Sequence, residues 1–355
     1  MAIASFTTKM TSILIVIGFA ILIIQIALLN SLIKRQVVAA ETILPSKVSH
    51  IIVIILENAD YSSIIGSSSA PYMTSIADQY ALLTDYHGLS HPSLPNYLGL
   101  IAGSSFNITD DRSPIDHTSI ADYKVIASLI DSKGLSWKAY MESMPLPCDK
   151  FSSGLYAVKH NPFVYFNDVT KNTIYCNNHV VDFVQLEQDF HNNNVPNIAF
   201  VTPNMKNDGH DTGVAFSDSW VKGFLPKIKD SPLFNNTLIF VTFDEDRPYT
   251  EKNHIYTVVV GPKNLVKMGF KSTSSYNHYS LLATIENIYG LGSLGRNDDK
   301  ARIIDDVFQE AANTDSTSIS VPGTIEIYWP FIVGLTLIPA ILSYPLYRRY
   351  KLKKR

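Results

Sequence analysis

The 355-residue sequence is poor in charge and in cysteine, and both shortages narrow what the protein can be. Charged side chains make up only 17% of the chain and the formal net charge is −3, so no nucleic-acid binding is expected. The two cysteines, Cys148 and Cys176, are too few for a structural zinc site. A lone pair of this kind in an oxidising compartment most simply forms one disulfide.

Hydrophobic residues make up 46% of the chain, and their excess is concentrated at its two ends. Residues 12–33 and 328–347 contain no charged side chain, and each is about as long as the roughly 20 residues of a membrane-spanning helix. Six lysines and arginines follow the second stretch, which places that tail in the cytoplasm and the preceding chain outside. The sequence therefore predicts a protein of the cell membrane with an extracytoplasmic catalytic domain.

This topology predicts a membrane anchor, an outer domain, a tether, and a transmembrane helix with a basic cytoplasmic tail, at residues 1–40, 41–312, 313–326 and 327–355. For the first part, a cleaved signal peptide is the alternative, because Val38-Ala39-Ala40 resembles a small-residue cleavage site. Lys34 and Arg35 stand between the apolar run and that site and favour an uncleaved anchor.

Apolar runs alternate with segments of helical spacing in the outer domain. Runs rich in Ile and Val predict strands at residues 50–56, 198–202, 237–243 and 255–260. Helical spacing occurs at residues 73–82, 123–132, 181–190, 220–228 and 279–289. The alternation predicts an α/β fold with a sheet covered by helices on both faces.

Polar residues follow three of these predicted strands: Glu57-Asn58 after the first, Pro203-Asn204 after the second and Asp244-Glu245 after the third. Ligands of open α/β sheets bind beyond the carboxyl ends of the strands. Acidic groups that meet at one edge repel each other unless a cation neutralises them. Each segment alone is equally well explained as a solvated turn, whereas all three together predict a binding site.

The segment His91-Pro-Ser-Leu-Pro-Asn-Tyr97 precedes an apolar helical stretch, residues 98–102. A helix start favours a phosphoryl anion, so Ser93 is a candidate nucleophile and Asn96 a candidate donor to a phosphoryl oxygen. On the residues alone, a helix-capping role for Ser93 is the more common explanation.

Six segments, in this order, resemble motifs of the phosphoesterase family: Glu57-Asn58, His91 to Tyr97, Lys159-His160-Asn161-Pro162-Phe163, His210-Asp211, Phe243-Asp244-Glu245-Asp246 and His278-Tyr279-Ser280. That family contains bacterial acid phosphatases and phosphatidylcholine-type phospholipases C. It belongs to the alkaline phosphatase-like superfamily, whose sheet is sandwiched by helices. The resemblance covers residues 50–290, almost the whole outer domain.

The resemblance implies a metal site formed by Glu57, Asn58, Ser93, Asp244 and Glu245. Oxygen ligands of this kind suit Ca²⁺, Mg²⁺ or Mn²⁺, and the histidines nearby leave Zn²⁺ open. A coordinated serine has a lowered hydroxyl pKa and attacks phosphorus. The implied reaction passes through a phosphoserine at Ser93 that the metal and Asn96 stabilise before water releases phosphate.

Four histidines are implied to contact the phosphoryl group or to protonate the leaving oxygen. His210 has the best support, because the neighbouring Asp211 can orient its imidazole. His160, His254 and His278 are expected to contact substrate. The expected disulfide would close a loop around His160 and brace that wall of the pocket, worth roughly 3 kcal/mol.

Arg247 marks a departure from the family. Bacterial phospholipases C have His-Gly-Gly after their Asp-Glu pair, whereas Asp246-Arg247-Pro248 stands here. This difference argues against phospholipase C specificity. Arg247 is expected to bind a second phosphate or a carboxylate of the substrate, or simply to pair with Asp246.

The predicted function is therefore metal-dependent hydrolysis of a small phosphoester, in the manner of an acid phosphatase. A phospholipase C-type diesterase acting on a phospholipid is one alternative. A non-catalytic surface protein on the same fold is another, but it would be expected to lack Ser93 or one of the paired carboxylates. A sulfatase would need arginine where Tyr97 stands.

Overall fold

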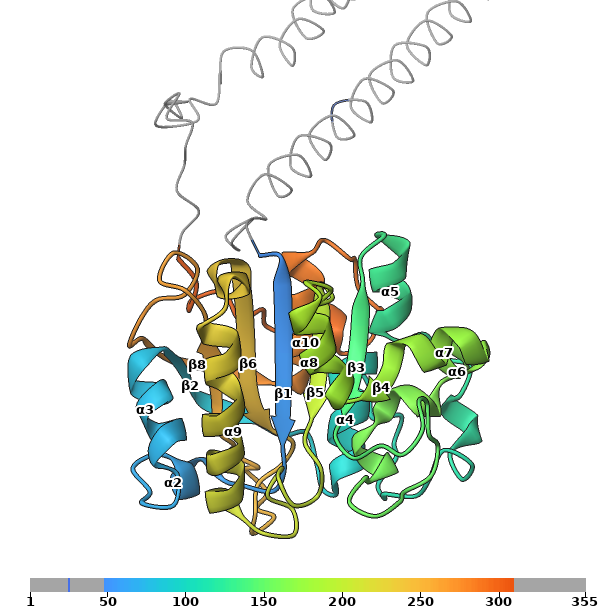
Figure 1. Cartoon of the computed structure of the whole chain (residues 1–355), viewed down its shortest axis with the longest axis horizontal. Helices are drawn as coiled ribbons and strands as arrows, with labels where there is room; N and C mark the ends of the chain where they lie inside the picture. Colours follow the sequence, from blue (N-terminus) through green and yellow to red (C-terminus); the bar gives the residue numbers. More distant parts are fainter. Residues whose placement is uncertain (1–24, 26–47, 310–355) are drawn as a thin grey trace, which may run out of the picture. The chain divides into compact units, whose positions relative to one another are not determined.

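A computed structural model of the chain describes Gln25 and residues 48–309 (Figure 1). Within these residues, no helix is both long enough and apolar enough to cross a membrane. The two predicted spans, apart from Gln25, and the predicted tether lie outside the described residues. The membrane topology and the four-part division of the chain therefore stay predictions.

The described residues form an α/β domain around one sheet of eight strands, in the order β4-β3-β5-β1-β6-β7-β2-β8. The strand bounds are β1 His50–Leu56, β2 Ala81–His87, β3 Trp137–Met141, β4 Val180–Asp182, β5 Ile198–Thr202, β6 Thr237–Phe243, β7 Thr257–Val260 and β8 Lys271–Asn277. β7 runs antiparallel to both of its neighbours, and all other neighbouring strands are parallel. The predicted α/β class is confirmed, with a mixed sheet.

Helices cover the two faces of this sheet (Figure 1). The α-helices are α2 Tyr61–Ile64, α3 Pro71–Gln79, α4 Ser93–Ala102, α5 Ile126–Ser132, α6 Asn167–Thr170, α7 Thr173–His179, α8 Val184–His191, α9 Val214–Lys229 and α10 His278–Ile288. Short 3₁₀ helices are η1 Thr118–Ile120, η2 Val158–His160, η3 Pro162–Tyr165, η4 Pro232–Asn236 and η5 Asp298–Lys300. α3 packs against α9, and α4 packs against α10.

The three central strands, β5, β1 and β6, have the bounds that the sequence predicted. Almost all of their side chains are buried, which explains why they are continuous apolar runs rather than alternating ones. In the register of β1 and β6, Leu56 lies opposite Phe243. Glu57 and Asp244 therefore leave the sheet side by side.

Other elements differ from the sequence predictions. The predicted helix at residues 73–82 ends at Gln79, and β2 begins at Ala81. The predicted helix at residues 181–190 is preceded by β4, and α8 begins at Val184. The predicted strand at residues 255–260 is the shorter, antiparallel β7. In the first two cases, residues with helical spacing join the sheet, because pairing with a neighbouring strand outweighs the local pattern.

Residues 48–309 begin and end at the amino-terminal ends of the parallel strands, opposite the end at which Glu57 lies. β1 starts at His50, and Val266, which follows β7, pairs with Phe308 near the end of the described chain. Because β7 runs antiparallel, the residues after it lie at the amino-terminal ends of the parallel strands. Both connections to the rest of the chain therefore leave from that end of the sheet.

Candidate active site

The ends of β1 and β6 are tied together by a residue with an unusual backbone. The Asn58 N–H donates to Asp244 Oδ1 at 3.0 Å, and its side-chain amide donates to Glu57 Oε2 at 3.4 Å. Asn58 has a φ of +57°, in the left-handed region that Asn tolerates better than most residues. This turn brings the side chains of Glu57, Asn58 and Asp244 to one edge of the sheet.

Ser93 lies between two carboxylates from different strands. It is the first residue of α4, and the cap position belongs to Pro92. The Ser93 hydroxyl lies 3.1 Å from Glu57 Oε2 and 3.4 Å from Glu245 Oε1, and the side chain is buried. The fold thus brings together the nucleophile and the acidic residues that the sequence predicted, from three separate parts of the chain.

Asn96 holds the turn that presents the serine. Its side-chain oxygen accepts the N–H groups of Leu89 at 2.6 Å and Ser90 at 3.2 Å. Its amide donates to the carbonyls of Ser90 at 2.8 Å and Pro92 at 3.2 Å. The predicted contact of Asn96 with a phosphoryl oxygen stays a prediction, and in the structure the amide binds the backbone.

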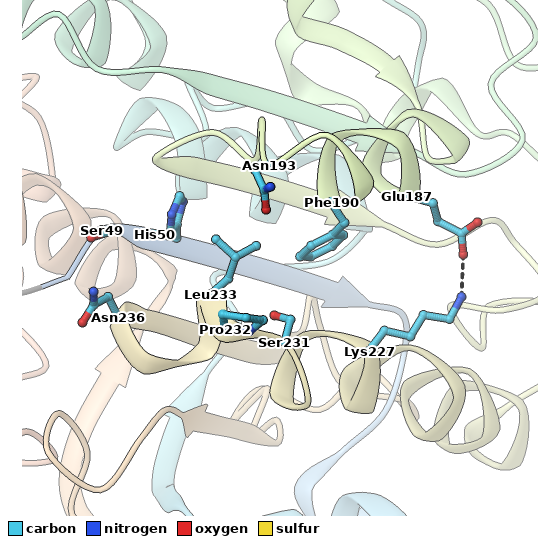
Figure 2. A pocket seen from close by; sticks show the side chains of 10 residues that line it. All are labelled: Ser49, His50, Glu187, Phe190, Asn193, Lys227, Ser231, Pro232, Leu233 and Asn236. Carbon is cyan, nitrogen blue, oxygen red and sulfur yellow. Dashed lines mark hydrogen bonds and ion pairs between the residues drawn. The ribbon is translucent and has the colours of Figure 1, made fainter.

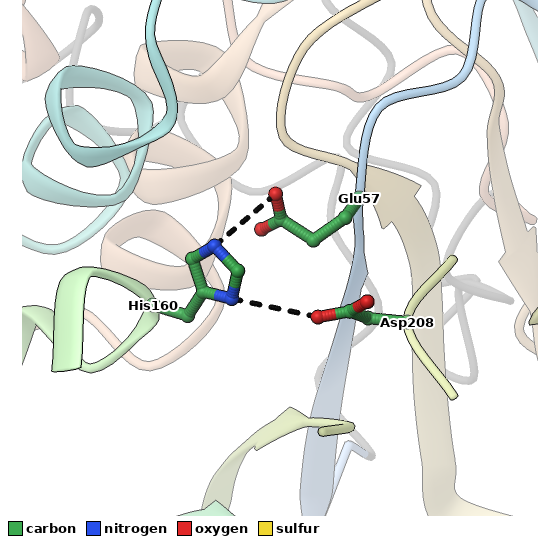
Figure 3. A group of neighbouring side chains, drawn as sticks. All are labelled: Glu57, His160 and Asp208. Carbon is green, nitrogen blue, oxygen red and sulfur yellow. Dashed lines mark ion pairs between the residues drawn. The ribbon is translucent and has the colours of Figure 1, made fainter. Parts of the chain in front are cut away.

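A second group of ligand-type side chains surrounds His160 (Figure 3). His160 Nε2 lies 3.3 Å from Glu57 Oε2, and Nδ1 lies 3.4 Å from Asp208 Oδ2. All three side chains are buried, and their ligand atoms lie within 4.8 Å of one another. The Tyr97 hydroxyl also donates to Glu57 Oε1. Glu57 is thus shared by this group and the group around Ser93.

The acidic residues at the carboxyl ends of β1 and β6 lack enough positive charge nearby to balance ionised carboxylates. Burial raises the pKa of Glu57 well above its usual range and also raises that of Asp244. Burial, with the charge of Asp244 adding to it, raises the pKa of Asp208 to about 8 and of Glu245 to about 9. Burial lowers the pKa of His160 well below its usual value, so this imidazole brings no charge.

Four buried polar atoms at this edge have no hydrogen-bond partner: Asn58 Oδ1, His160 Nε2, Asp208 Oδ2 and Asp244 Oδ2. Buried polar atoms are nearly always paired, so such a concentration indicates a missing partner. Carboxylate and amide oxygens with one imidazole are ligands for a divalent cation. The residues present therefore fit the predicted metal, and they leave its identity open.

A cavity of about 380 Å³ opens beside Ser93. Nine residues line it: Asn58, His91, Pro92, Ser93, Asp111, Lys159, His210, Glu245 and Tyr249. His210 Nδ1 lies 2.8 Å from Asp211 Oδ1, as the sequence predicted for an oriented imidazole. This cavity joins the candidate nucleophile Ser93, the predicted metal ligands Asn58 and Glu245, and Lys159, so we assign the candidate active site to it.

Four residues predicted to contact substrate do not line this cavity: His160, which lies in the buried group described above, His254, His278 and Arg247. His278 is buried between the Tyr86 hydroxyl at 3.2 Å and the Asp244 carbonyl at 2.7 Å, and burial lowers its pKa to about 4. His254 Nε2 lies 2.9 Å from the Thr84 carbonyl. Arg247 is exposed and forms no ion pair with any residue that the structure describes. Asp246, the alternative partner of Arg247, instead accepts the Thr250 N–H at 2.9 Å.

No role in the site was predicted for four residues of this region: Asp208, Asp111, and two residues of the motif segments, Lys159 and His91. His91 Nδ1 lies 2.5 Å from Glu245 Oε2, so His91 braces a predicted ligand as well as the turn. Asp208 is reached through the loop after β5, and its Oδ1 accepts the His210 N–H at 2.7 Å. The signal that could have revealed Asp208 was its place two residues before the His210-Asp211 motif.

The expected disulfide between Cys148 and Cys176 is confirmed. The two Cα atoms lie 5.6 Å apart and the bond closes a loop with a sequence separation of 28. Lys159 and His160, which belong to η2, lie within this loop. The bond therefore constrains the segment that supplies one wall of the cavity.

Another cavity, of about 430 Å³, lies at the opposite end of β1 beside His50 (Figure 2). Phe190 and Leu233 lie across it from each other, and Lys227 pairs with Glu187 at its rim, at 2.5 Å. None of the predicted site residues lines it. Its size resembles that of the cavity at Ser93, but it brings together no nucleophile and no ligand cluster.

Comparison with known proteins identifies the family. The model of the Phosphoesterase family matches residues 67–292, which include every motif named above except Glu57-Asn58. The chain belongs to this family. A probable acid phosphatase of Kluyveromyces lactis is 35% identical over 293 residues, which cover 79% of this chain and 66% of the relative. A phosphatidylinositol-3-phosphatase of Mycobacterium tuberculosis is 33% identical over 261 residues, covering 73% of this chain and 83% of the relative.

The fold is similar to that of a solved structure from the alkaline phosphatase superfamily. A solved structure from Vibrio parahaemolyticus, a protein in the alkaline phosphatase superfamily, matches with a TM-score of 0.52 over 73% of this chain and 74% of that chain. Its sequence identity is 14%, so the match shows the shared fold alone. The chain spans between 58% and 66% of the length of the fungal acid phosphatases that it matches.

Proposed function

We propose that this phosphoesterase hydrolyses small phosphate esters by nucleophilic attack of Ser93 with the help of a divalent metal ion. The observation that carries this proposal is the position of Ser93. Its hydroxyl lies between Glu57 and Glu245, in a cavity bordered by a buried acidic cluster with unpartnered ligand atoms. The acid phosphatases among the relatives support the same class of reaction.

Two overlapping groups of residues would hold the metal. The family resemblance favours Glu57, Asn58, Ser93, Asp244 and Glu245, and the geometry groups Glu57 with His160 and Asp208. Both groups contain Glu57, so one ion or two neighbouring ions are compatible with the arrangement. A bound divalent cation would lower the pKa of a coordinated serine hydroxyl and would stabilise negative charge on phosphoryl oxygens.

The reaction follows from the placement of the chain's own groups. Ser93 Oγ attacks phosphorus, and its proton passes to a neighbouring carboxylate, of which Glu57 is the nearest at 3.1 Å. The bond from phosphorus to the alcohol oxygen breaks, and that oxygen takes up a proton from solvent in the part of the cavity that His210 lines. Water then attacks the phosphoserine and gives up a proton to solvent; the bond from phosphorus to Ser93 Oγ breaks, phosphate leaves, and Ser93 Oγ recovers the proton held by the carboxylate.

The substrate that we propose is a soluble phosphoester outside the cytoplasm. Both ends of residues 48–309 lie at the amino-terminal ends of the parallel strands, whereas the cavity lies at their carboxyl ends. A phospholipase C activity has less support, because Asp246-Arg247-Pro248 replaces the His-Gly-Gly of the bacterial phospholipases. Localisation to the outer membrane face rests on the two apolar stretches and the basic tail.

A substrate panel with a Ser93→Ala variant tests the proposal. Full-length protein in detergent is given phosphomonoesters, phosphodiesters and phospholipids with different divalent ions. Ser93→Ala should lower turnover of the best substrate by about 10³-fold or more, because the covalent route is lost. Ser68→Ala, at an exposed loop serine, is the matched control and should leave turnover unchanged. Near-normal turnover by Ser93→Ala would contradict the proposed nucleophile.

A further inference from the structure

Lys159 is the only lysine or arginine among the residues that line the cavity beside Ser93. Its side chain is mostly buried, with 18% exposure, so its ammonium group acts at short range rather than through bulk solvent. The carboxyl groups on the same wall are those of Asp111 and Glu245, and the imidazoles of His91 and His210 complete the ionisable groups there.

Asp111 fixes this ammonium group relative to the nucleophile. One of its oxygens, Oδ1, accepts the Leu94 N–H at 2.9 Å, and the other, Oδ2, accepts from Lys159 Nζ at 2.9 Å. Leu94 directly follows Ser93 in α4. A single carboxylate thus links the start of the nucleophile helix to the lysine, and the disulfide loop holds the lysine from the other side.

The hydrogen bonds of Lys159 leave one donor free for a ligand. An ammonium group has three N–H donors and no acceptor. One points to Asp111, and a second points to His210 Nε2 at 3.2 Å. Nε2 must then be an acceptor, which places the imidazole proton on Nδ1, next to Asp211 Oδ1. The described residues use no third N–H of Lys159.

We propose that Lys159 is a catalytic residue that binds a phosphoryl oxygen of the substrate through this third N–H, and that Asp111 and His210 position it. This inference rests on the proposed phosphoester hydrolysis and deepens it. A phosphomonoester carries up to two negative charges on the phosphoryl group, and a diester carries one. The extra cation therefore selects for the monoester dianion, with the contact strengthened as charge concentrates on the oxygens.

The test compares Lys159→Met, Lys159→Arg and Lys206→Met in the full-length protein. Lys206 is exposed, lies over the Phe216 ring and does not line the cavity, so it is a matched control. The readouts are kcat/KM for p-nitrophenyl phosphate and for bis(p-nitrophenyl) phosphate, and inhibition by inorganic phosphate. Melting curves confirm that each variant folds.

Lys159→Met should lower kcat/KM for the monoester by about 100-fold and for the diester by about 10-fold or less. Its inhibition constant for phosphate should rise by a similar factor of about 100, and Lys159→Arg should recover part of both losses. Lys206→Met should match the wild type. Equal losses for both substrates, with unchanged phosphate inhibition, would overturn the proposal, because they indicate a structural role alone.

Two further outcomes keep this inference separate from the proposed function. If the wild type hydrolyses both esters and Ser93→Ala does not, but Lys159→Met keeps the wild-type selectivity, the lysine proposal alone is wrong. If the wild type hydrolyses neither ester, the proposed function fails, and calorimetric binding of inorganic phosphate to wild type and Lys159→Met still tests the lysine. Should Lys159→Met not fold, Asp111→Asn, which keeps an acceptor for Leu94, must show the same shift in selectivity.

Discussion

Two pairs of buried aspartates in this domain differ in how completely their carboxylate oxygens are hydrogen-bonded. Asp189 and Asp218, in the body of the domain, are 2% and 4% exposed, and Asp208 and Asp244, at the candidate active site, are 0% and 1% exposed. Asp189 accepts from Lys138 at 2.6 Å and from the Tyr140 hydroxyl at 2.7 Å. Asp208 and Asp244 each keep one oxygen without a hydrogen-bond partner.

Asp218 shows that a cation is not the only way to satisfy a buried carboxylate. It accepts the N–H groups of Tyr72 at 3.3 Å and Met73 at 2.7 Å, in the first turn of α3. Helix starts carry free N–H groups and a partial positive charge, so this placement is favourable. Asp189 and Asp218 are therefore satisfied by ordinary means. The incomplete pairing at Asp208 and Asp244 indicates a site that a ligand completes.

The sharpest way to test this contrast is to break the satisfied pair. Lys138→Met leaves the Asp189 carboxylate buried without its cation, and such a change typically costs about 3 kcal/mol. The midpoint of thermal unfolding should fall by about 6–12 °C for a domain of this size. Thermal melting followed by circular dichroism measures the shift, and phosphatase activity below the transition should be retained.

The control for that variant is an ion pair on the surface. Lys227 and Glu187 lie 2.5 Å apart, but their side chains are 57% and 54% exposed. Lys227→Met should change the free energy of unfolding by about 1 kcal/mol or less. An equal loss in both variants would mean that burial does not distinguish the two kinds of carboxylate, and the comparison would lose its basis.

An effect of opposite sign is expected for Asp208→Asn in metal-free protein. The pKa of Asp208 in the folded state, about 8, lies above that of an unfolded aspartate, so the folded state binds the extra proton. The stability contributed by this group is present at low pH and is lost as the pH rises through about 8. Asn keeps an acceptor for the His210 N–H and carries no charge, so it removes that loss.

Melting curves in chelator at pH 5 and pH 8 measure this effect. The melting temperature of Asp208→Asn relative to wild type should rise between the two pH values, because over this range the wild type loses the stability that the raised pKa of Asp208 contributes. A fall of the size expected for Lys138→Met would show that Asp208 is satisfied in the folded protein without a ligand.

The parts of the fold that the sequence predicted are those where burial is complete. β1, β5 and β6 are covered on both faces, so each is a continuous apolar run with clear ends. β8 has the sequence KSTSSYN and is the outermost strand on one side of the sheet. Its exposed polar residues hide the apolar pattern by which a strand is predicted from sequence. β4 has only three residues, too few for any periodic pattern.

The residues of the site also divide into those that the local sequence predicts and those that only the tertiary fold brings together. Glu57, Ser93 and Asp244 stand at strand ends or at a helix start, so motif and topology together were enough to predict that they meet. Asp111 and Lys159 meet only through a loop that the disulfide closes and a turn after α4, and no spacing in the sequence encodes that contact. Such partners are determined by the tertiary fold.

The central claim is that a divalent ion completes the acidic cluster at Glu57, and metal content read with thermal melting tests it most directly. Full-length wild type and Asp244→Asn are analysed for bound metal before and after dialysis against chelator. The account predicts about one or two ions per chain in the wild type and less metal in Asp244→Asn. Removal of the metal should abolish activity and lower stability, by about 4 kcal/mol where the free ion exceeds its Kd about 1,000-fold. Full activity and unchanged melting in protein verified to be free of metal would contradict the account.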